Sequence, residues 1–430
     1  MCIRPFALNQ QSTFWARKRR LAGLVLLGSC LGVAFWFLRR SQPGPVVKGV
    51  KISAIASHSA VLKPDGTLWA WIDNALFLDS APSLGIGLPG QIAKGSNWRA
   101  IATGWQAFAA IKQNGTLCVW GNGANGLWND RTLQITGTPT QVGTDTDWKD
   151  VAAGNDFFIG LKNDGGLWAW GGNRFGQLGD GTGGKKEDPG SEVAPVSGKK
   201  EPVPIGKDND WTQVAARVFR ATALKRDGSL WAWGWNIYGE LGDRTYEIRN
   251  APVRIGKDND WEAVFTGNNH TLAIKRDGSL WAWGDNPEGQ LGNGTKIKES
   301  APIRVGTDTN WLAAAGGAYH TLAIKTDGSL WAWGLNDQGQ LGDGTKVNRL
   351  RPIKIGKDRD WVAIAAGERH SIGLKQDGSV WEWGMMRRPP EGKPLRWLRN
   401  NLSKVGIKLP AFVNLRPMKA FNARPDNPMQ

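Results

Sequence analysis

The sequence predicts an all-β repeat protein of seven units, each with four short antiparallel strands, preceded by one N-terminal transmembrane helix. A hairpin motif, clearest as HTLAIKRDGSLWAWG in residues 270–284, recurs at spacings of 49, 50, 63, 50, 50 and 50 residues. Glycine and tryptophan are frequent, with 57 and 25 among 430 residues, and few stretches show helical periodicity. A unit of this length is typical of solenoids, arrays and propellers. Residues 21–38 form a long uncharged apolar run.

The N-terminal residues predict a membrane anchor. Residues 1–20 are a polar tail that ends in four consecutive bases, residues 17–20. Residues 21–38, LAGLVLLGSCLGVAFWFL, are at the short end of what spans a bilayer as a helix. The bases directly before this run favour a cytoplasmic N-terminus. We therefore expect a single-pass membrane protein whose repeats are exported to the periplasm or the cell exterior.

Two other processing routes are alternatives for this segment. Residues 27–30, Leu-Gly-Ser-Cys, resemble the box at which bacteria cleave and lipidate a cysteine, here Cys30. A mature lipoprotein usually continues with polar residues, whereas LGVAFWFL follows Cys30. A cleaved signal peptide needs small residues after the apolar core, and this run ends in FWFLRR instead. The residues therefore favour the uncleaved anchor.

Residues 39–48 are predicted to form a short linker, stiffened by Pro43 and Pro45. The repeats begin at residue 49, and each unit opens with a strand that most often starts with tryptophan. The two hairpin strands follow, joined by a dipeptide such as Asp277-Gly278 that suits a tight turn. A glycine loop, clearest as NDQGQLGDGT at 336–345, leads to a last short strand. That strand carries a proline, which suits an outer edge position, at Pro89, Pro139, Pro202, Pro252, Pro302 and Pro352.

Several copies depart from this pattern. The glycine loop is altered in copies one, two and seven. Copy three has 63 residues where the others have about 50, and its extra residues at 183–202 are expected on a loop that connects two units. In copy seven, residues 402–406 lie 50 residues after 352–356 and are expected to form the last strand. The repeat region is therefore predicted to span 49–406, followed by a C-terminal tail at 407–430.

The net charge of +16 belongs to the two ends of the chain. Residues 1–51 carry nine bases and no acid, and residues 385–430 carry ten bases and two acids. The residues between them hold 35 bases against 36 acids. A neutral repeat region does not indicate a nucleic-acid-binding face. The three cysteines do not make a disulfide framework, and Cys118, which stands in a tryptophan column, is expected to be buried.

The repeat resembles that of the regulator of chromosome condensation repeat family, with its H-x-L-A-L-K-x-D-G-x-L-W-A-W-G-x-N-x-x-G-Q-L-G pattern. The resemblance covers residues 49–406 and implies a seven-bladed β-propeller of four-stranded blades. Together with the apolar run 21–38, it suggests a membrane-anchored, bacterial-type member that forms a monomeric ring. The founding member is a nucleotide-exchange factor for a small GTPase and binds chromatin, but its exchange residues cannot be placed here because only the blade framework is similar. A secreted propeller that inhibits β-lactamase shares the fold.

Residues that recur in every unit are interpreted as framework. Nineteen of the tryptophans fall in three repeat columns and are expected to pack the blades together. The lysine before each hairpin turn is expected to be solvated. No nucleophile–base pair, paired carboxylates or zinc spacing is found, so no catalytic, metal or cofactor residue is predicted. The histidines share one column and are expected to hydrogen-bond within their own blade: His58, His270, His320 and His370.

We therefore expect a non-catalytic module that binds an unknown protein or cell-envelope partner. The alternatives are an exported enzyme inhibitor, or an exchange-type regulator of a small GTPase if the repeats are cytoplasmic. The basic stretch 387–408 either contacts anionic lipid headgroups or completes the last blade. The candidate partner contacts lie outside the repeat columns or in the insertion: Trp105, Trp128, Trp235, Tyr246, Lys185, Lys186, Lys199, Lys200 and Trp397.

Overall fold

The structure is a computed structural model that describes residues 51–55, 58–72, 90–93, 95, 97–105, 107–121, 136–184, 198–385 and 414–422. All of them belong to the unit Val46–Gln430. The predicted tail 1–20, anchor 21–38 and linker 39–48 fall outside the described residues. Within the described part of the chain, no helix is both long and apolar enough to cross a membrane.

Seven four-stranded antiparallel sheets follow one another along the chain, each with its strands paired in sequence order, which confirms the predicted seven-bladed propeller. The first four blades are blade 1, with β1 (Lys51–Ile55), β2 (His58–Leu62), β3 (Leu68–Ile72) and β4 (Gly90–Ala93); blade 2, with β5 (Trp98–Thr103), β6 (Ala107–Lys112), β7 (Leu117–Gly121) and β8 (Thr136–Gln141); blade 3, with β9 (Trp148–Ala153), β10 (Phe157–Lys162), β11 (Leu167–Gly172) and β12 (Gly198–Pro204); and blade 4, with β13 (Trp211–Arg217), β14 (Arg220–Lys225), β15 (Leu230–Gly234) and β16 (Arg249–Arg254). The other three are blade 5, with β17 (Trp261–Thr266), β18 (His270–Lys275), β19 (Leu280–Gly284) and β20 (Glu299–Arg304); blade 6, with β21 (Trp311–Gly316), β22 (His320–Lys325), β23 (Leu330–Gly334) and β24 (Arg349–Ile355); and blade 7, with β25 (Trp361–Ala366), β26 (His370–Lys375), β27 (Ser379–Gly384) and β28 (Asn414–Asn422).

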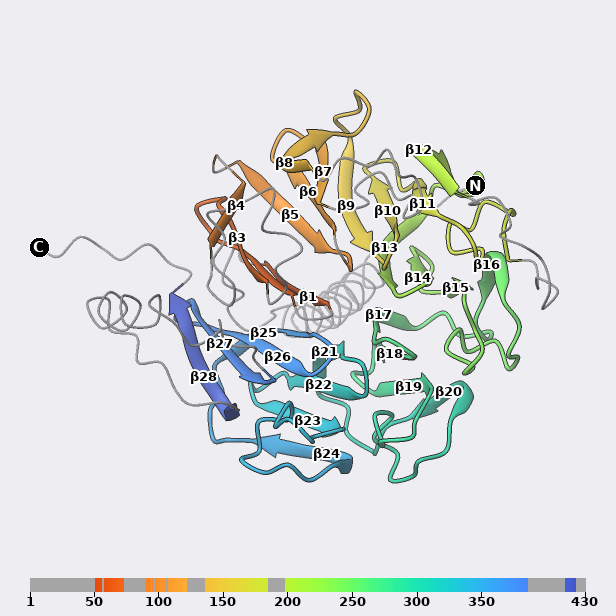
Figure 1. Cartoon of the computed structure of the whole chain (residues 1–430). Coiled ribbons are helices and arrows are strands. Elements are labelled where there is room, and N and C mark those ends of the chain that lie inside the picture. The colour runs from red at the N-terminus through yellow and green to blue at the C-terminus, as the bar shows by residue number, and fades with distance from the viewer. Residues whose placement is uncertain are drawn as a thin grey trace, which may run out of the picture. The chain divides into compact units, whose positions relative to one another are not determined.

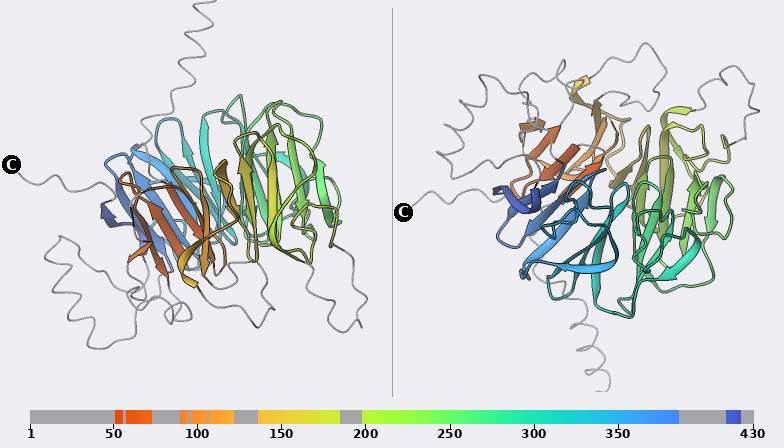
Figure 2. Two further views of the ribbon diagram at one scale, coloured as in Figure 1. Left: turned by 90° about the horizontal axis from the view of Figure 1, so that it is seen from above. Right: turned by 60° about the horizontal axis from the view of Figure 1, so that its bottom comes forward.

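The blades surround a common centre, with the first strand of each blade innermost (Figure 1). The strands run between two opposite faces (Figure 2). Strands one and two of a blade, and strands three and four, connect on one face, which we call the loop face. The hairpin turns between strands two and three, and the connections between blades, lie on the other, the turn face. The chain enters the propeller at the turn face, because β1 begins there.

The central hairpin of each blade forms for the reason that its sequence predicts. In blade 5, Trp281 pairs with Ala273 across the hairpin. Gly278 in the turn has a φ of 80°, which side chains disfavour. Asp277 Oδ1 accepts hydrogen bonds from the backbone N–H of Ser279 at 2.8 Å and from its hydroxyl at 2.6 Å. The aspartate side chain therefore closes the turn that the glycine permits.

The last strand of blade 7 differs from the prediction. It is β28, not residues 402–406, and Gly384 faces Asn414 just as Gly334 faces Arg349 in blade 6. The prediction was wrong because it kept the 50-residue spacing, whereas pairing with the third strand decides the register. The signal that finds the strand is its sequence, since LRPMK in β28 matches LRPIK in β24. The propeller therefore reaches Asn422, and residues 402–406 lie outside the described residues.

The extra residues of copy three lie inside a blade, not between two blades as predicted. They separate β11 from β12, and residues 198–202 already belong to β12. A connection between strands three and four runs along the loop face, where extra length leaves the strand pairing of the blade intact.

Seven apolar clusters of the described residues join each blade to the next. In the cluster between blades 4 and 5, Leu241 packs with Trp261 and Trp283. The second tryptophan of each pair is buried in blades 2 to 7, and so is the opening tryptophan. These two columns therefore pack the blades together, as predicted. Cys118 is also buried as predicted, in the cluster between blades 1 and 2.

The ring closes through side chains, because blades 1 and 7 each consist of four strands of their own. Ala54 and Val61 of blade 1 pack against Ile372 of blade 7 in one apolar cluster. Ser59 Oγ also lies 2.9 Å from His370 Nε2. Among the described strands, none from one end of the chain completes the blade of the other, so these side-chain contacts link the first and last blades.

The lysine that ends the second strand of a blade was predicted to be solvated, but it is largely buried. Lys275 is 9% exposed, and its Nζ lies 2.6 Å from Asp258 and 3.0 Å from Asp260. The same Nζ lies 4.8 Å from the ring centroids of Trp261 and Trp281. The prediction was wrong because a lysine can bury its stem between two rings and still reach carboxylates. Blades 3, 4 and 7 repeat the arrangement at Lys162, Lys225 and Lys375.

Replacing Lys275 by methionine keeps the length of the side chain but removes its charge. We expect Lys275→Met to lower the free energy of unfolding by about 1–2 kcal/mol, because both carboxylates lose their partner and the rings lose a cation. Urea denaturation followed by tryptophan fluorescence measures this. Lys257→Met, at an exposed position of the turn face, is the matched control and should change little. Equal effects of both changes would contradict the prediction.

Candidate binding face

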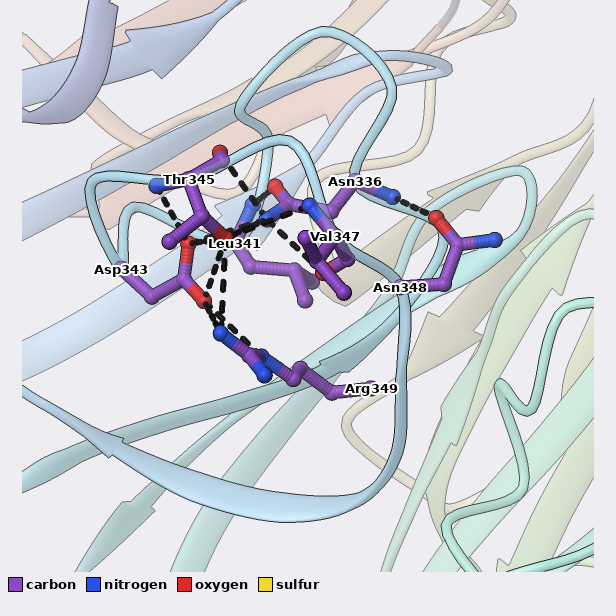
Figure 3. A network of polar contacts seen from close by, with 7 residues as sticks. All are labelled: Asn336, Leu341, Asp343, Thr345, Val347, Asn348 and Arg349. Atoms are coloured by element: carbon purple, nitrogen blue, oxygen red, sulfur yellow. Dashed lines mark hydrogen bonds and ion pairs between the residues drawn. The ribbon is translucent and has the colours of Figure 1, made fainter.

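Each well-formed loop between strands three and four is held by one buried asparagine. In blade 6, Asn336 Nδ2 donates to Asp343 Oδ1 at 2.9 Å and to the carbonyls of Thr345 and Val347 at 3.1 Å each (Figure 3). Arg349 adds an ion pair with Asp343 at 2.8 Å. Asparagines 236 and 286 make corresponding bonds in blades 4 and 5. The loops of blades 4 to 6 are therefore held by the same internal bonds, which fix their backbones.

Histidines join neighbouring blades on this face. His270 Nε2 lies 3.0 Å from Thr321 Oγ1 of the next blade. Because Thr321 donates its hydroxyl proton to the Gln290 carbonyl at 2.8 Å, the same oxygen accepts from His270 Nε2, which therefore carries the ring proton. Burial lowers the pKa of His270, so the ring is neutral at pH 7. The prediction of bonds within one blade was wrong, because the second strand of the next blade lies within reach of the ring.

The glycine three residues before each of these histidines makes room for the ring. A Cβ atom on Gly267 would lie 2.2 Å from the ring of His270, and one on Gly317 would lie 2.2 Å from that of His320. Blade 4 replaces both members of the pair, with Arg217 in place of the glycine and Arg220 in place of the histidine. We therefore expect the two replacements to depend on each other.

Arg217 links four blades of the ring. It is 6% exposed and lines the central channel. Its Nη1 donates to the carbonyls of Ala54 in blade 1 at 3.1 Å and Ala366 in blade 7 at 2.9 Å, and its Nε donates to Asn268 Oδ1 in blade 5 at 2.8 Å. The turn that carries it is strained at Val218, whose φ of 53° is rare for a β-branched residue.

Arg220 is fully buried against the backbone of blade 5. Its Nη2 donates to the carbonyls of Gly267 at 2.8 Å and His270 at 2.7 Å, and its Nη1 donates to that of Asn268. Burial lowers the pKa of Arg217 and of Arg220 to about 10, so both stay charged at neutral pH. Neither forms an ion pair with a described residue. The junction of blades 4 and 5 therefore buries two positive charges.

Glu240 stands in blade 4 where blades 3, 5 and 6 have glutamine. It is fully buried, and its Oε2 accepts a hydrogen bond from the Tyr238 N–H at 2.7 Å. Its Oε1 has no partner among the described residues. Burial raises the pKa of Glu240 to about 7, although the positive charge of Arg220 acts in the opposite direction.

The shifted pKa of Glu240 predicts a pH dependence of stability. The Glu240 carboxyl binds its proton more tightly in the folded protein than in the unfolded chain, where its pKa is 4.5. The resulting stabilisation of the fold is present below pH 4.5 and is lost as the pH rises through 7. We expect Glu240→Gln to be more stable than the parent at pH 8 by about 1–3 kcal/mol and nearly equal to it at pH 5. Denaturant titrations at both pH values measure this. Gln290→Glu should introduce the same pH dependence of stability in blade 5. A stability difference between Glu240→Gln and the parent that is the same at both pH values would contradict the raised pKa of Glu240.

Arg244 is a second strained position of blade 4. Its φ is 68°, in a column where blades 3, 5 and 6 have glycine. Its N–H donates to the Ser300 carbonyl at 2.8 Å, as the N–H of Gly294 donates to that of Leu350. The loop therefore keeps the glycine conformation although a side chain is present, at a cost of about 1 kcal/mol. That side chain is exposed.

Three rings from two blades meet beside these residues. The ring of Phe175, from the loop of blade 3, lies 4.9 Å from Phe219 and 4.4 Å from Trp235 of blade 4, centroid to centroid. The backbone N–H of Trp235 donates to the Phe219 carbonyl at 3.0 Å, which fixes the relative position of the two residues. All three rings are half-buried. The corresponding residues at the junction of blades 5 and 6 are Glu288, Tyr319 and Leu335, so that described junction lacks an all-aromatic cluster.

Two family models, both described as the regulator of chromosome condensation (RCC1) repeat, match the chain. The first matches residues 164–216, 227–274, 277–324 and 327–374, and the second matches 148–177, 261–290, 313–340 and 361–388. Together these residues make up more than half of the sequence. The chain belongs to the RCC1 repeat family. The resemblance of the repeat motif is thereby confirmed.

Two solved structures show the similarity of the fold. Prp20p from Saccharomyces cerevisiae, studied for its binding to Gsp1p and histones, is 19% identical with a TM-score of 0.63, over 83% of this chain and 86% of its own. Human WBSCR16 is 19% identical with a TM-score of 0.60, over 71% of this chain and 83% of its own. At these identities the likeness shows the fold alone. A search of curated proteins found no significant match.

Three of the predicted contact residues lie on the loop face of the RCC1 repeats. Trp105 is half-buried in the turn between β5 and β6, Trp235 belongs to the aromatic cluster, and Tyr246 is 46% exposed. Lys199 and Lys200 lie on the outer strand β12, where Lys199 faces Gly171. The remaining predicted contacts lie outside the described residues: Trp128, Lys185, Lys186 and Trp397.

Sequence reasoning missed several residues of this face. The signal was present, because each of them breaks an RCC1 repeat column that blades 3, 5 and 6 keep. A comparison of blade 4 with blades 5 and 6, position by position, finds them: Arg217, Glu240 and Arg244. Phe175 and Phe219 stand in columns that vary between blades, so only their contact in the structure indicates them.

Proposed function

We propose that this chain is a non-catalytic propeller that binds a protein partner through its loop face and is tethered to a membrane by residues 21–38, with the repeats exported. The observation that carries the proposal is where the residues that differ from the repeat pattern lie. In blade 4 they collect on the loop face, beside an aromatic cluster that no other described junction has. The turn face repeats its lysine–aspartate arrangement from blade 3 to blade 7.

The chemistry of the loop face supports a protein partner. Recognition usually resides in loops on a rigid scaffold, and protein interfaces are enriched in tryptophan, tyrosine and arginine. Trp235, Tyr246 and Arg244 are residues of these types on asparagine-held loops. Prp20p has the same fold and was studied for its binding to two kinds of protein.

Chemical cross-linking in the native cells, followed by capture of the full chain, tests the binding proposal. The double variant Phe175→Ser/Trp235→Ser removes the aromatic cluster, and Lys257→Ser/Lys357→Ser is the matched change on the turn face. We expect the first variant to lose a partner that the parent and the second variant retain. Retention by both variants, or loss by both, would sink the assignment to the loop face.

A reporter fusion tests the tether. An alkaline phosphatase joined after residue 430 should be active if the repeats are exported, and inactive if they face the cytoplasm. Cys30→Ala should leave the protein in the membrane fraction. Release of the Cys30→Ala protein would favour the lipoprotein instead of the uncleaved anchor.

A further inference from the structure

Exposed apolar side chains of the described residues gather on the loops of three consecutive blades. The large ones that are more than a third exposed are Ile237, Tyr246, Ile297, Leu312 and Val347, and all but Leu312 lie in the loops between strands three and four of blades 4 to 6. Ile297 is 67% exposed and Val347 is 56% exposed. Side chains of this kind normally pack inward, so their concentration on one part of the loop face indicates a binding surface.

These side chains are held outward by the loop frame. Asn286 Nδ2 donates to the Ile297 carbonyl at 2.9 Å, and Asn336 Nδ2 donates to the Val347 carbonyl at 3.1 Å. These bonds fix the backbone of both residues, and Figure 3 includes the network around Asn336, while the apolar side chains remain exposed. Little conformational entropy is lost when a partner covers such a residue.

The same loop segments are basic, although the repeat region as a whole is neutral. Residues 244–248, 294–298 and 344–348 contain four bases and one acid, Glu247. The bases are exposed on all three blades: Arg244, Lys296, Lys298 and Lys346. The half-buried Glu288 lies 3.9 Å from Lys296, and Asp285 interacts electrostatically with Lys298, so these two acids compensate part of this charge and leave an excess of one positive charge.

Contacts between neighbouring loops make the segments one surface. Lys298 Nζ of blade 5 lies 4.6 Å from the ring centroid of Tyr246 of blade 4. Glu288 of blade 5, which approaches Lys296, also accepts a hydrogen bond from Asn348 of blade 6 at 2.6 Å. Arg244 adds its charge at a position where the backbone favours glycine, so the side chain is kept in spite of the strain.

We propose that this surface, the loop rim, binds an acidic segment of the partner protein that also carries apolar side chains. The loop rim is Arg244, Tyr246, Lys296, Ile297, Lys346 and Val347. The inference rests on the proposed function and names the chemistry of the partner. Basic residues alternate with apolar ones across three blades, so an extended segment can place carboxylates on the bases and apolar groups between them. A protein segment fits better than a lipid surface, because a segment can place its carboxylates on the bases and away from the neighbouring Glu247, whereas a continuous layer of anionic headgroups cannot avoid that charge.

Fluorescence anisotropy of the full chain with a labelled peptide of alternating glutamate and leucine tests the proposal. We expect saturable binding that weakens as salt rises, about tenfold weaker binding by Ile297→Ser/Val347→Ser, and a similar loss in Lys296→Glu/Lys346→Glu. Peptides with lysine in place of glutamate, or serine in place of leucine, should bind at least tenfold more weakly. Arg244→Gly restores the glycine of the sister blades, so it should raise the melting temperature while it weakens binding, which separates recognition from folding.

Three outcomes would overturn the assignment. They are no binding of the acidic peptide by the parent, equal binding by the rim variants, and preferential binding to vesicles of phosphatidylserine in phosphatidylcholine. Failure of this inference is distinguishable from failure of the proposed function. If the rim variants still capture the native partner and the Phe175→Ser/Trp235→Ser variant does not, the proposal of a protein partner on the loop face is supported. The proposal that the loop rim binds this partner is then wrong.

Discussion

Arg220→His is expected to lower the free energy of unfolding by about 3–5 kcal/mol, even though histidine is the residue of this column in blades 5 to 7. The change removes the guanidinium that bonds three carbonyls of blade 5. It also places the histidine ring against the Cβ of Arg217. In blades 5 and 6, a Cβ atom on the glycine of this column would lie 2.2 Å from the histidine ring. A substitution toward the repeat consensus is therefore expected to be strongly destabilising.

Arg217→Gly in the same chain is expected to restore part of this loss, about 2 kcal/mol. The glycine makes room for the ring, and the new histidine can then donate to Thr271 Oγ1 as His270 donates to Thr321. The restoration stays incomplete because the bonds of Arg217 to blades 1 and 7 are lost. Arg217→Gly alone should therefore also destabilise the ring. Chemical denaturation of the two single variants and the double variant measures the coupling, and additive effects would contradict it.

Trp283→Ala is expected to cost about 3–5 kcal/mol, because it opens a cavity between blades 4 and 5. Trp283 is fully buried and packs in one cluster with Leu241 and Trp261. Thermal unfolding should show a lower melting temperature, while capture of a partner at a permissive temperature should be unchanged. Trp281→Ala, at the half-buried position of the same pair, should cost less. Unchanged stability of Trp283→Ala together with a loss of binding would show that the ring contacts a ligand instead.

The fold could be predicted from local patterns because each blade is nearly independent of distant sequence. Asp277, Gly278 and the alternation around Trp281 are enough to form a hairpin, and a neighbouring copy of the same unit buries its apolar face. The same reasoning failed for β28, since a strand that pairs across a long connection is positioned by its partner and not by the repeat spacing.

The candidate site was only partly predictable. Trp235 and Tyr246 stood out because they interrupt the repeat, but Lys275 was taken as solvated although it is enclosed by two rings and two carboxylates. Whether a charged residue on a strand is exposed depends on which side chains of the preceding connection pack against it, here Asp258 and Asp260. That information is not local to the strand.

The sequence by itself determined the number of blades, the strand order and the columns that pack, because these follow from short-range pairing repeated seven times. Only the tertiary structure decided how the ring closes and where the residues that differ from the repeat pattern come together. Arg217 bonds Ala54 and Ala366, which are far from it in the sequence, because the circular arrangement brings the first and last blades within reach of blade 4 across the channel. The loop rim likewise exists only because three similar loops, each unremarkable alone, are set side by side by the packing of their blades.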